Sequence, residues 1–211
     1  MSRCVIVGGA EIADYSHIKR YLDEGDFTIF CDSGLKHMEK LAVQPDLIVG
    51  DFDSWPEPQL DVETVVLPSV KDDTDTFYAV REARKRGFTE ILMIGVTGGR
   101  VDHTLGNLYI LYDLDEAGIR AVIADDYSEM SVVSDKTEYI SDRYPFFSLL
   151  NMTGKAEGID IRNAKYELKD AAIQSGYQYG ISNEVLKGRV AEVSVKNGKL
   201  LLIKVVRDRV N

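Results

Sequence analysis

The stretch that decides the fold is "EILMIGVTGGRVDHTLGNLYILYDLDEAGIRAVIAD", residues 90–125. It opens with an apolar run typical of a buried strand, passes through a glycine turn and continues as a helix-like segment that ends at Gly118. A second apolar run follows directly. Near-continuous apolar strands joined by a helix are typical of a parallel sheet that helices cover on both faces. The stretch therefore predicts an α/β fold.

The residues before this stretch repeat the same alternation. The predicted strands are "RCVIVGG", "FTIFCDSG", "DLIVGD" and "DVETVVLP". The predicted helices are "YSHIKRYLDEG", "LKHMEKLAV" and "TDTFYAVREARKRG". We therefore expect a mostly parallel, three-layer, Rossmann-like α/β domain over residues 1–126.

From about Tyr127 the pattern changes to short runs rich in Val, Ile, Phe and Tyr, with turn residues between them and no convincing helix. These runs are "EMSVVSD", "TEYIS", "FFSLLNM", "AEGIDI", "AKYELK", "RVAEVSVKNG" and "KLLLIKVV". Asn197-Gly198 is a hairpin signal. The pattern predicts an antiparallel β-sandwich or barrel over residues 127–211.

Charge and composition exclude several classes of function. The net charge of −10 disfavours nonspecific binding to nucleic acid or to an anionic membrane. No apolar run approaches the roughly 20 residues of a membrane span, and the N-terminus is unlike a secretory signal. Cys4 and Cys31 lie in apolar, strand-like runs, so we expect buried free thiols. The expected location is the cytoplasm.

Acidic residues gather where the predicted strands end. Asp51 and Asp53 follow the third strand, and "KDDTD", residues 71–75, follows the fourth. Turn and helix N-cap roles explain part of this pattern, because Asp serves both well. They do not explain why two acidic clusters should meet at one edge of the sheet, where parallel strands deliver their ligands. Clustered carboxylates suit Mg²⁺, and we interpret Asp51 and Asp53 as metal ligands.

The segment "TGGRVDH", residues 97–103, supplies complementary chemistry. Gly98 and Gly99 let the backbone approach a phosphate closely, and Arg100 can neutralise its charge. The competing interpretation is a strand–turn–helix connection with Asp102 as the N-cap. The sequence contains neither a GxxxxGK[ST] P-loop nor a GxGxxG fingerprint, so the ordinary nucleotide motifs do not apply.

The three histidines are less informative. His17 and His37 fall in predicted surface helices, where we expect them to be solvated. His103 follows Asp102, and both a ligand contact and a structural role at the helix start remain open. No Ser/His/Asp or Cys/His set supports nucleophilic catalysis.

Five motifs in this order resemble the thiamine pyrophosphokinase family. They are "CDSG" (31–34), "PDLIVGDFDS" (45–54), "KDDTD" (71–75), "GGRVDHTLGNL" (98–108) and "GISNE" (180–184). The resemblance spans essentially the whole chain. It implies a thiamine diphosphokinase that transfers a diphosphoryl group from ATP to the hydroxyl of thiamine with Mg²⁺, giving thiamine diphosphate and AMP. It also implies an α/β nucleotide-binding catalytic domain, a β-sandwich for thiamine binding and dimerisation, and a homodimer with thiamine at the subunit interface.

The resemblance also implies roles for individual residues. Metal ligands would be Asp51, Asp53 and Asp75, and catalytic residues would be Asp75, Asp102 and Arg100. The ATP site would comprise Asp32, Ser33, Gly34, Lys71, Gly98, Gly99, Arg100 and His103. Thiamine would meet Ser182, Asn183 and Asp72. Either Asp75 or Asp102 could orient or deprotonate the attacking hydroxyl.

The chain departs from the family pattern at two places. Asp32-Ser33-Gly34 stands where the family often has "DGG". The family's "GLKY"-like stretch is represented by "NAKYELK", residues 163–169, which lacks the glycine. No role follows for Trp55. The alternatives are another Mg²⁺-dependent pyrophosphotransferase or pyrophosphohydrolase, which needs no "SNE" pocket, and a noncatalytic nucleotide or thiamine sensor.

Overall fold

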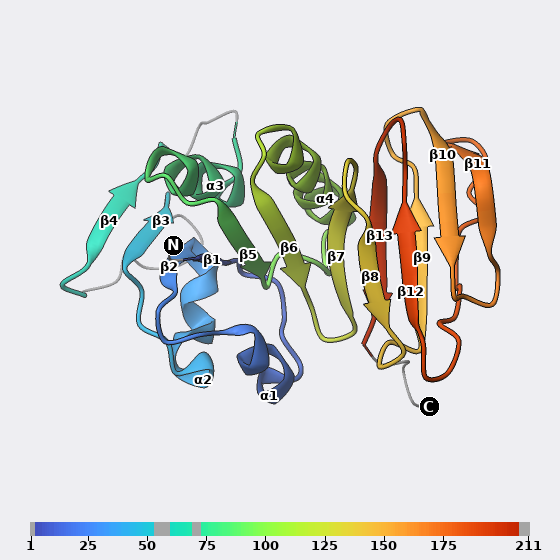
Figure 1. Ribbon diagram of the computed structural model, residues 1–211. Helices are drawn as coiled ribbons and strands as arrows, with labels where there is room; N and C mark the ends of the chain where they lie inside the picture. The colour runs from blue at the N-terminus through green and yellow to red at the C-terminus, as the bar shows by residue number, and fades with distance from the viewer. Residues whose placement is uncertain (1–2, 53–59, 69–72, 207–211) are drawn as a thin grey trace. The chain divides into compact units, whose positions relative to one another are not determined.

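The chain folds as two units, Met1–Asp126 and Tyr127–Asn211, in the computed structural model of Figure 1. The structure describes residues 3–52, 60–68 and 73–206. The first unit is an α/β domain and the second is a β-sandwich, so the predicted fold class is confirmed. No helix in the described part of the chain is long and apolar enough to cross a membrane.

The first unit is built on parallel strands in the order β4-β3-β2-β1-β5-β6. The strands are β1 Cys4–Val7, β2 Phe27–Cys31, β3 Leu47–Gly50, β4 Glu63–Val66, β5 Glu90–Ile94 and β6 Arg120–Ala124. Strands are added outward from β1 to β4, and the chain then returns to place β5 on the other side of β1. All six strands therefore end at the same edge, where ligands bind in open α/β sheets.

Helices cover both faces of this sheet, with α3 and α4 on one face and α1 and α2 on the other (Figure 1). The helical elements are α1 Tyr15–Ile18, η1 Lys19–Tyr21, η2 Asp32–His37, α2 Met38–Leu41, α3 Asp75–Lys85 and α4 Val101–Glu116. The last two match their prediction closely. Gly87 and Gly118 follow them at positive φ, which ends each helix.

The predicted helix over residues 15–25 is wrong in its length. The α-helical part ends at Ile18, and η1 follows it to Tyr21. The carbonyl of Tyr21 accepts a hydrogen bond from Arg3 Nη2 at 2.6 Å, and Arg3 also pairs with Asp26 at 2.7 Å. Because Arg3 engages that carbonyl and the residue after η1 is extended, the chain leaves the helix early.

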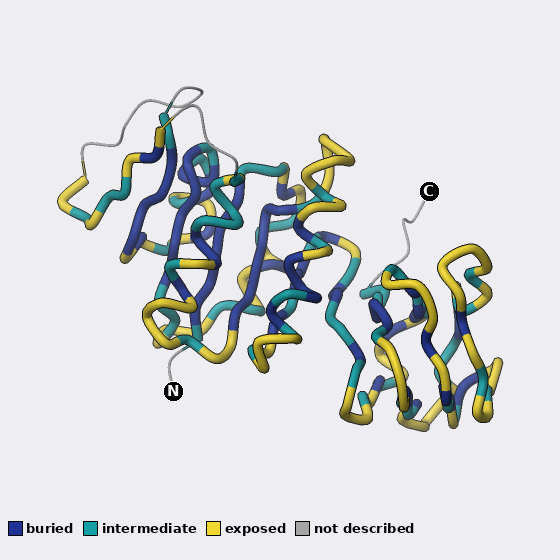
Figure 2. Tube along the Cα trace, turned by 90° about the horizontal axis from the view of Figure 1, so that it is seen from above, coloured by how far each residue is buried: buried dark blue, intermediate teal, exposed yellow. Residues whose placement is uncertain are grey.

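The core lies on both faces of the strands, which form the dark-blue layer of Figure 2. Val5, Val7, Phe30 and Ile48 share one cluster with Ile18 of α1. The alternate strand residues are buried as well. Among these are Cys4 and Cys31, which are free thiols as predicted. Such two-sided burial explains why the strands read as continuous apolar runs.

The two histidines predicted to be solvated are buried. His37 is fully enclosed, and its Nδ1 lies 2.7 Å from the Tyr15 hydroxyl while its Nε2 lies 2.8 Å from the Ala10 carbonyl. The carbonyl can only accept, so Nε2 carries the proton and Nδ1 accepts from Tyr15. Burial lowers the pKa of His37. His17 is also buried and packs edge-on against the ring of Tyr21.

The second unit contains two antiparallel sheets, with orders β7-β13-β9 and β11-β10-β12-β8. The strands are β7 Ser128–Val133, β8 Glu138–Ser141, β9 Phe146–Leu150, β10 Lys155–Arg162, β11 Leu168–Gln174, β12 Val190–Ser194 and β13 Leu200–Val205. Buried residues of both sheets form one apolar cluster that includes Ile140, Phe147, Ile161 and Leu202. This arrangement is a sandwich and not a barrel.

The hairpin predicted at Asn197-Gly198 is wrong. The strand before the turn, β12, pairs with β10 and β8, whereas β13 after it pairs with β7 and β9. The turn therefore crosses from one sheet to the other. The Asn197 carbonyl accepts from the Glu157 N–H at 2.9 Å, which ties the turn to β10. The strand predicted over residues 164–169 is also displaced, because β11 begins only at Leu168.

Candidate active site

The carboxyl ends of β1 and β5 define the point where the strand order reverses. The loops that follow these two strands pack tightly against each other. A Cβ added to Gly8 would lie 2.6 Å from the Gly95 carbonyl oxygen, and the Gly8 N–H donates to the Ile94 carbonyl at 2.9 Å. Only glycine permits this approach of two backbones. In open α/β sheets, ligands bind outside the carboxyl ends of the strands at such a point.

Asp32 and Asp51 leave neighbouring strands at the same edge. A Cβ on Gly50 would lie 2.7 Å from Cβ of Asp32, so β3 ends in direct contact with the residue that follows β2. Asp32 is buried, with 5% of its surface exposed. Asp51 follows Gly50 immediately and is half-buried. The structure therefore brings these two acids to adjoining strand ends.

Asp75 approaches the end of β2 from the first turn of α3. The Cys31 thiol is hydrogen-bonded to Thr76, and its pKa is raised by burial first and next by the charge of Asp75, with a smaller contribution from Asp32. Asp75 thus lies within electrostatic range of the strand that leads into Asp32. Thr74 caps the helix, because its hydroxyl accepts from the Phe77 N–H at 3.2 Å.

The described residues contain no group of three His, Cys, Asp or Glu side chains that could by themselves hold a metal ion. Three predicted site residues, Asp53, Lys71 and Asp72, lie outside the described residues. The metal set of Asp51, Asp53 and Asp75 therefore stays a prediction.

At the start of α4, Arg100 and Asp102 form a forked ion pair on the surface. Arg100 Nη2 donates to Asp102 Oδ2 at 2.6 Å, and Arg100 Nε donates to Oδ1 at 3.2 Å. Their side chains are 70% and 64% exposed. The pair lowers the pKa of Asp102 to about 2, helped by the His103 N–H, which donates to Oδ1 at 3.0 Å. Arg100 occupies the N-cap position, so the interpretation of Asp102 as the N-cap is wrong.

The glycine turn before α4 has the backbone freedom expected from the sequence. Gly98 and Gly99 have φ of 98° and 65°, and no atom lies within 4 Å of a Cβ added at either position. The Gly98 N–H donates to Thr104 Oγ1 at 3.0 Å, and that hydroxyl donates to the Arg100 carbonyl at 3.1 Å. The turn is thus fixed to the first turn of α4 while its outer side stays open.

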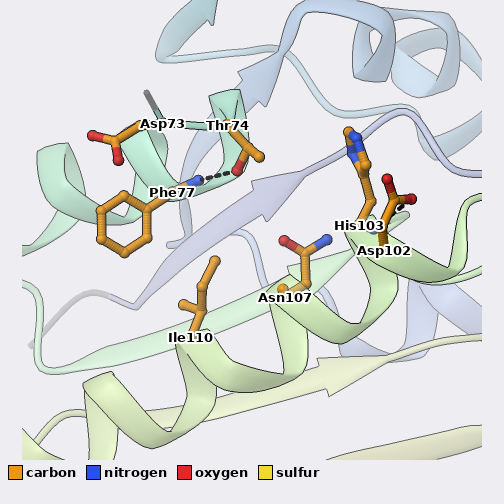
Figure 3. A pocket seen from close by; sticks show the side chains of 8 residues that line it. Asp73, Thr74, Phe77, Asp102, His103, Asn107 and Ile110 are labelled. Atoms are coloured by element: carbon orange, nitrogen blue, oxygen red, sulfur yellow. Dashed lines mark hydrogen bonds between the residues drawn. The ribbon is translucent and has the colours of Figure 1, made fainter. Parts of the chain in front are cut away.

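A pocket of about 400 Å³ lies between the beginnings of α3 and α4 (Figure 3). Its lining comprises Asp73, Thr74, Phe77, Asp102, His103, Gly106, Asn107 and Ile110. Two motifs some 30 positions apart in the sequence, "KDDTD" and "GGRVDH", therefore contribute to one cavity. Asp73 is paired with Arg81 at 3.0 Å.

The sequence analysis assigned no site role to six of the lining residues, Asp73, Thr74, Phe77, Gly106, Asn107 and Ile110. A usable signal existed for Asn107, which lies four positions after His103 and so shares its face of α4. The apolar residues gave no such signal, because core residues on the same helices look identical in sequence.

In the second unit, Asn183 is 5% exposed and holds a neighbouring loop. Its Oδ1 accepts from the N–H groups of Tyr166 at 3.0 Å and Glu184 at 2.9 Å, and its Nδ2 donates to the Tyr166 carbonyl at 2.8 Å. Ser182 is exposed at a φ of 56°, and its N–H donates to Ser148 Oγ at 3.0 Å. The amide of Asn183 is therefore largely committed to internal bonds, whereas the Ser182 side chain faces solvent.

Models of known protein families match residues in both units of the chain. The family model described as "Thiamin pyrophosphokinase, catalytic domain" matches residues 18–123, and that described as "Thiamin pyrophosphokinase, vitamin B1 binding domain" matches residues 135–200. The chain therefore belongs to the thiamin pyrophosphokinase family of enzymes.

Individual relatives agree with this assignment. The chain is 27% identical over 192 residues to "Thiamine pyrophosphokinase" of Bacillus subtilis, covering 87% of this chain and 89% of that protein. The solved structure of the B. subtilis protein superposes with a TM-score of 0.84 at 25% identity over 98% of this chain and 100% of that chain. The Geobacillus thermodenitrificans structure gives 0.84 at 25% identity, covering 98% of each chain. Thiamin pyrophosphokinase from Candida albicans shares the fold, with a TM-score of 0.77 at 14% identity over 98% of this chain and 89% of that chain.

Proposed function

We propose that the chain transfers a diphosphoryl group from ATP to the hydroxyl of thiamine in a Mg²⁺-dependent reaction. The thiamine hydroxyl oxygen forms a bond to the β-phosphorus, and the bond from that phosphorus to the oxygen bridging the α- and β-phosphates breaks. AMP leaves, thiamine diphosphate forms, and the hydroxyl proton is released. Family membership supports the reaction class, and the site supports its chemistry.

The observation that carries the proposal is the pocket that the "KDDTD" and "GGRVDH" motifs share. Thr74 and Asp102 line one cavity, with Asp75 at the adjoining helix start and Arg100 beside Asp102. Phosphoryl-type transfer needs mainly positioning and charge neutralisation, and it needs little covalent chemistry from the protein. A cavity lined by acids, with Arg100 paired to one of them and an open glycine turn in the same motif, meets that need.

The donor set fits Mg²⁺. Carboxylate oxygens are the hard ligands that this ion prefers. Asp51 offers them directly after Gly50, which contacts Asp32, and Asp75 lies within electrostatic range of Cys31, the residue before Asp32. We assign Asp51, Asp53 and Asp75 as the residues that would hold the ion. When bound, Mg²⁺ supplies positive charge to the phosphate oxygens.

The remaining residues of the α/β unit act on ATP and on the attacking hydroxyl. Arg100 keeps N–H groups beyond the two that bind Asp102, and these would bind phosphate oxygens. The Gly98 N–H already donates to Thr104, so the turn would offer the backbone N–H of Gly99. Arg100 and the His103 N–H both donate to the Asp102 carboxylate, so we assign Asp102 to orienting Arg100. Either Asp75 or Asp102 would orient or deprotonate the attacking hydroxyl.

Asp32, Ser33, Gly34, Lys71 and His103 complete the proposed ATP site. Gly34 fits its position because a Cβ there would lie 2.3 Å from the Val7 carbonyl oxygen, so η2 can start close to β1.

We further propose that the first unit is the catalytic domain and the second the thiamine-binding and dimerisation domain. Ser182 would contact thiamine directly, and Asn183 would support this surface by fixing the backbone of Tyr166. The vitamin B1 binding description of the family model over residues 135–200 supports this assignment. Asp72 stays assigned to the same substrate, with the site at the interface of a homodimer. The proposed location is the cytoplasm, where ATP is available and free thiols stay reduced.

Incubation of the protein with ATP, MgCl₂ and thiamine, followed by chromatography of the products, tests the function. We expect AMP and thiamine diphosphate in equal amounts, no AMP without thiamine, and no turnover with excess EDTA. AMP release without thiamine would indicate a pyrophosphohydrolase instead. Binding of both substrates without any product would indicate a sensor.

A further inference from the structure

The pocket between α3 and α4 contains one buried polar group that the proposed chemistry does not use. Asn107 is 6% exposed and lines the cavity from the second turn of α4. Its Nδ2 donates to the Val96 carbonyl at 2.7 Å, which ties the helix to the loop after β5. Within the described part of the chain, its Oδ1 accepts no hydrogen bond.

This hydrogen bond fixes the orientation of the amide. The Val96 carbonyl can only accept, so the nitrogen must face it and the oxygen must face away from it. Figure 3 shows the Asn107 oxygen directed toward the α3 side of the pocket, where Phe77 lies. Rotation of the amide by 180° would set two oxygens against each other, so the acceptor is held in place.

The wall of the pocket beside this acceptor is apolar, and the pocket is roomy. Phe77 and Ile110 lie near Asn107 (Figure 3), and Gly106 has no atom within 4 Å of an added Cβ. The rest of the lining is polar and comprises Asp73, Thr74, Asp102 and His103. A flat ring can therefore lie between α3 and α4 against Phe77 and Ile110, with an N–H donor directed at Asn107 Oδ1. Such pockets bind through apolar walls and take their selectivity from a few fixed polar groups.

We propose that this pocket binds a 4-aminopyrimidine ring and that Asn107 recognises its exocyclic amino group. The inference rests on the proposed function, because both proposed substrates carry this chemistry. Thiamine contains it as its pyrimidine ring, and ATP contains it as the six-membered half of adenine. Asp102 and His103 line the same pocket, so a ring at Asn107 would place the rest of the substrate near the start of α4.

Replacing the amino group by an oxo group tests the recognition on the substrate side. The thiamine analogue with a 4-oxo group and inosine triphosphate both place a carbonyl oxygen where the proposed hydrogen bond to Asn107 Oδ1 needs a donor. A buried polar group left facing an acceptor rejects the analogue strongly. We expect kcat/KM to fall at least about tenfold for one of the two analogues, and the analogue that is rejected identifies which substrate fills the pocket.

The variant Asn107→Ser replaces the fixed acceptor by a shorter hydroxyl that can both donate and accept, so we expect it to lose that discrimination. The kcat/KM values for the amino and the oxo substrate are measured with the same preparation of the variant. A loss of folded protein lowers both values equally and cancels from their ratio. If the unaltered enzyme uses each oxo analogue as well as its amino parent, the proposal is overturned. Discrimination that persists in the Asn107→Ser variant also overturns it.

A second variant fills the pocket without weakening the fold. Gly106→Leu adds a side chain where the structure has open space and replaces a helix glycine, so we expect equal or higher thermal stability. We expect KM to rise at least about tenfold for the substrate whose ring fills the pocket. Tyr109→Leu changes an exposed residue of the same helix outside the pocket and serves as the control. An unchanged KM for both substrates in Gly106→Leu would contradict the proposal.

A failure of the pocket proposal can be distinguished from a failure of the proposed function. If the unaltered protein forms no product, the proposed function fails on its own. Calorimetric titration with AMP against inosine monophosphate, and with thiamine against its 4-oxo analogue, then still tests the pocket. Weaker binding of one oxo compound that Asn107→Ser abolishes supports the proposal, and equal binding within both pairs contradicts it.

Discussion

The start of α4 and the segment at Ser182–Glu184 both carry motif residues of the family, yet the two regions use them differently. Arg100 and Asp102 are more than half exposed and bind mainly each other. Asn183 is buried and makes three hydrogen bonds to its own unit. The polar atoms of a motif residue can therefore either lie at the surface, where a ligand can bind them, or form hydrogen bonds within the protein. Sequence similarity alone does not separate the two cases.

The glycines of the first unit show the same contrast. Gly50 and Gly34 have no room for a Cβ because backbone or Asp32 lies in the way. Gly98 and Gly99 have open space but positive φ. The first pair allows close packing beneath the site, and the second gives an open turn at its surface.

The largest expected effect concerns two half-buried acids that would act on the substrate and not on the fold. We expect Asp51→Asn and Asp75→Asn each to lower kcat at least about a hundredfold, because each removes a charge that would hold Mg²⁺ against the phosphates. Both changes keep the size of the side chain, so the thermal midpoint of unfolding should stay close to that of the unaltered protein. Steady-state assays at saturating Mg²⁺ give the measurement.

Asp61→Asn is the matched control, because Asp61 is exposed and lies away from the strand ends that carry the site. Normal turnover by either the Asp51 or the Asp75 variant would remove that residue from the metal site.

Gly50→Ala tests the packing beneath the site. The new Cβ would lie 2.7 Å from Asp32 Cβ, so β3 or Asp32 must shift. We expect a loss of roughly 1–3 kcal/mol in the free energy of unfolding and at least about a tenfold loss of kcat/KM for ATP. Urea denaturation and initial rates measure both. Gly25→Ala has open space around its Cβ and should leave both quantities nearly unchanged. Wild-type rates in Gly50→Ala would show that Asp32 can move without consequence.

Asn183→Ala tests the buried side of the comparison. Its loss leaves the Tyr166 and Glu184 backbone groups without their partner, so we expect a loss of roughly 2–4 kcal/mol of unfolding free energy. We also expect KM for thiamine to rise more than KM for ATP. Ser182→Ala, at an exposed position, should change stability by no more than about 0.5 kcal/mol. The reverse kinetic pattern, with ATP more affected, would argue against a thiamine site in this unit.

The smallest effect concerns the Arg100–Asp102 pair. The pKa of the Asp102 carboxyl is about 2 and lies below its ordinary value, so the ion pair is present at neutral pH and is lost only as pH falls through about 2. In Arg100→Gln we expect this pKa to rise toward about 3.9 but to stay below it, because the His103 N–H still donates to the carboxylate. A ¹³C NMR titration of the side-chain carboxyl measures the shift. An unchanged midpoint would show that Arg100 does not bind Asp102 in solution.

The long elements of the fold followed from local sequence. The helices α3 and α4 were predicted because each has a clear start and a glycine at its end, and the strands were predicted because burial on both faces makes them continuously apolar. Short elements were less predictable. The early end of α1 depends on Arg3, which lies more than ten positions away in the sequence and reaches the Tyr21 carbonyl.

Pairing between distant segments explains the other differences. Asn197-Gly198 has the composition of a hairpin turn, but the sandwich sends β12 and β13 to different sheets. His37 has the sequence context of a surface helix, but the Ala10 carbonyl and the Tyr15 hydroxyl enclose it. In both cases the outcome depends on partners that a local pattern does not contain.

The sequence by itself determined the two fold classes, the acidic and glycine-rich strand ends and the family, because periodicity and motif order are properties of the linear chain. The tertiary structure alone decided that Asp32 lies against Gly50, that Asn183 holds Tyr166, and that Asn107 turns its oxygen into a pocket between two helices. The physical reason is that hydrogen-bond partners and packing neighbours are set by three-dimensional proximity, which residue type and spacing constrain without specifying.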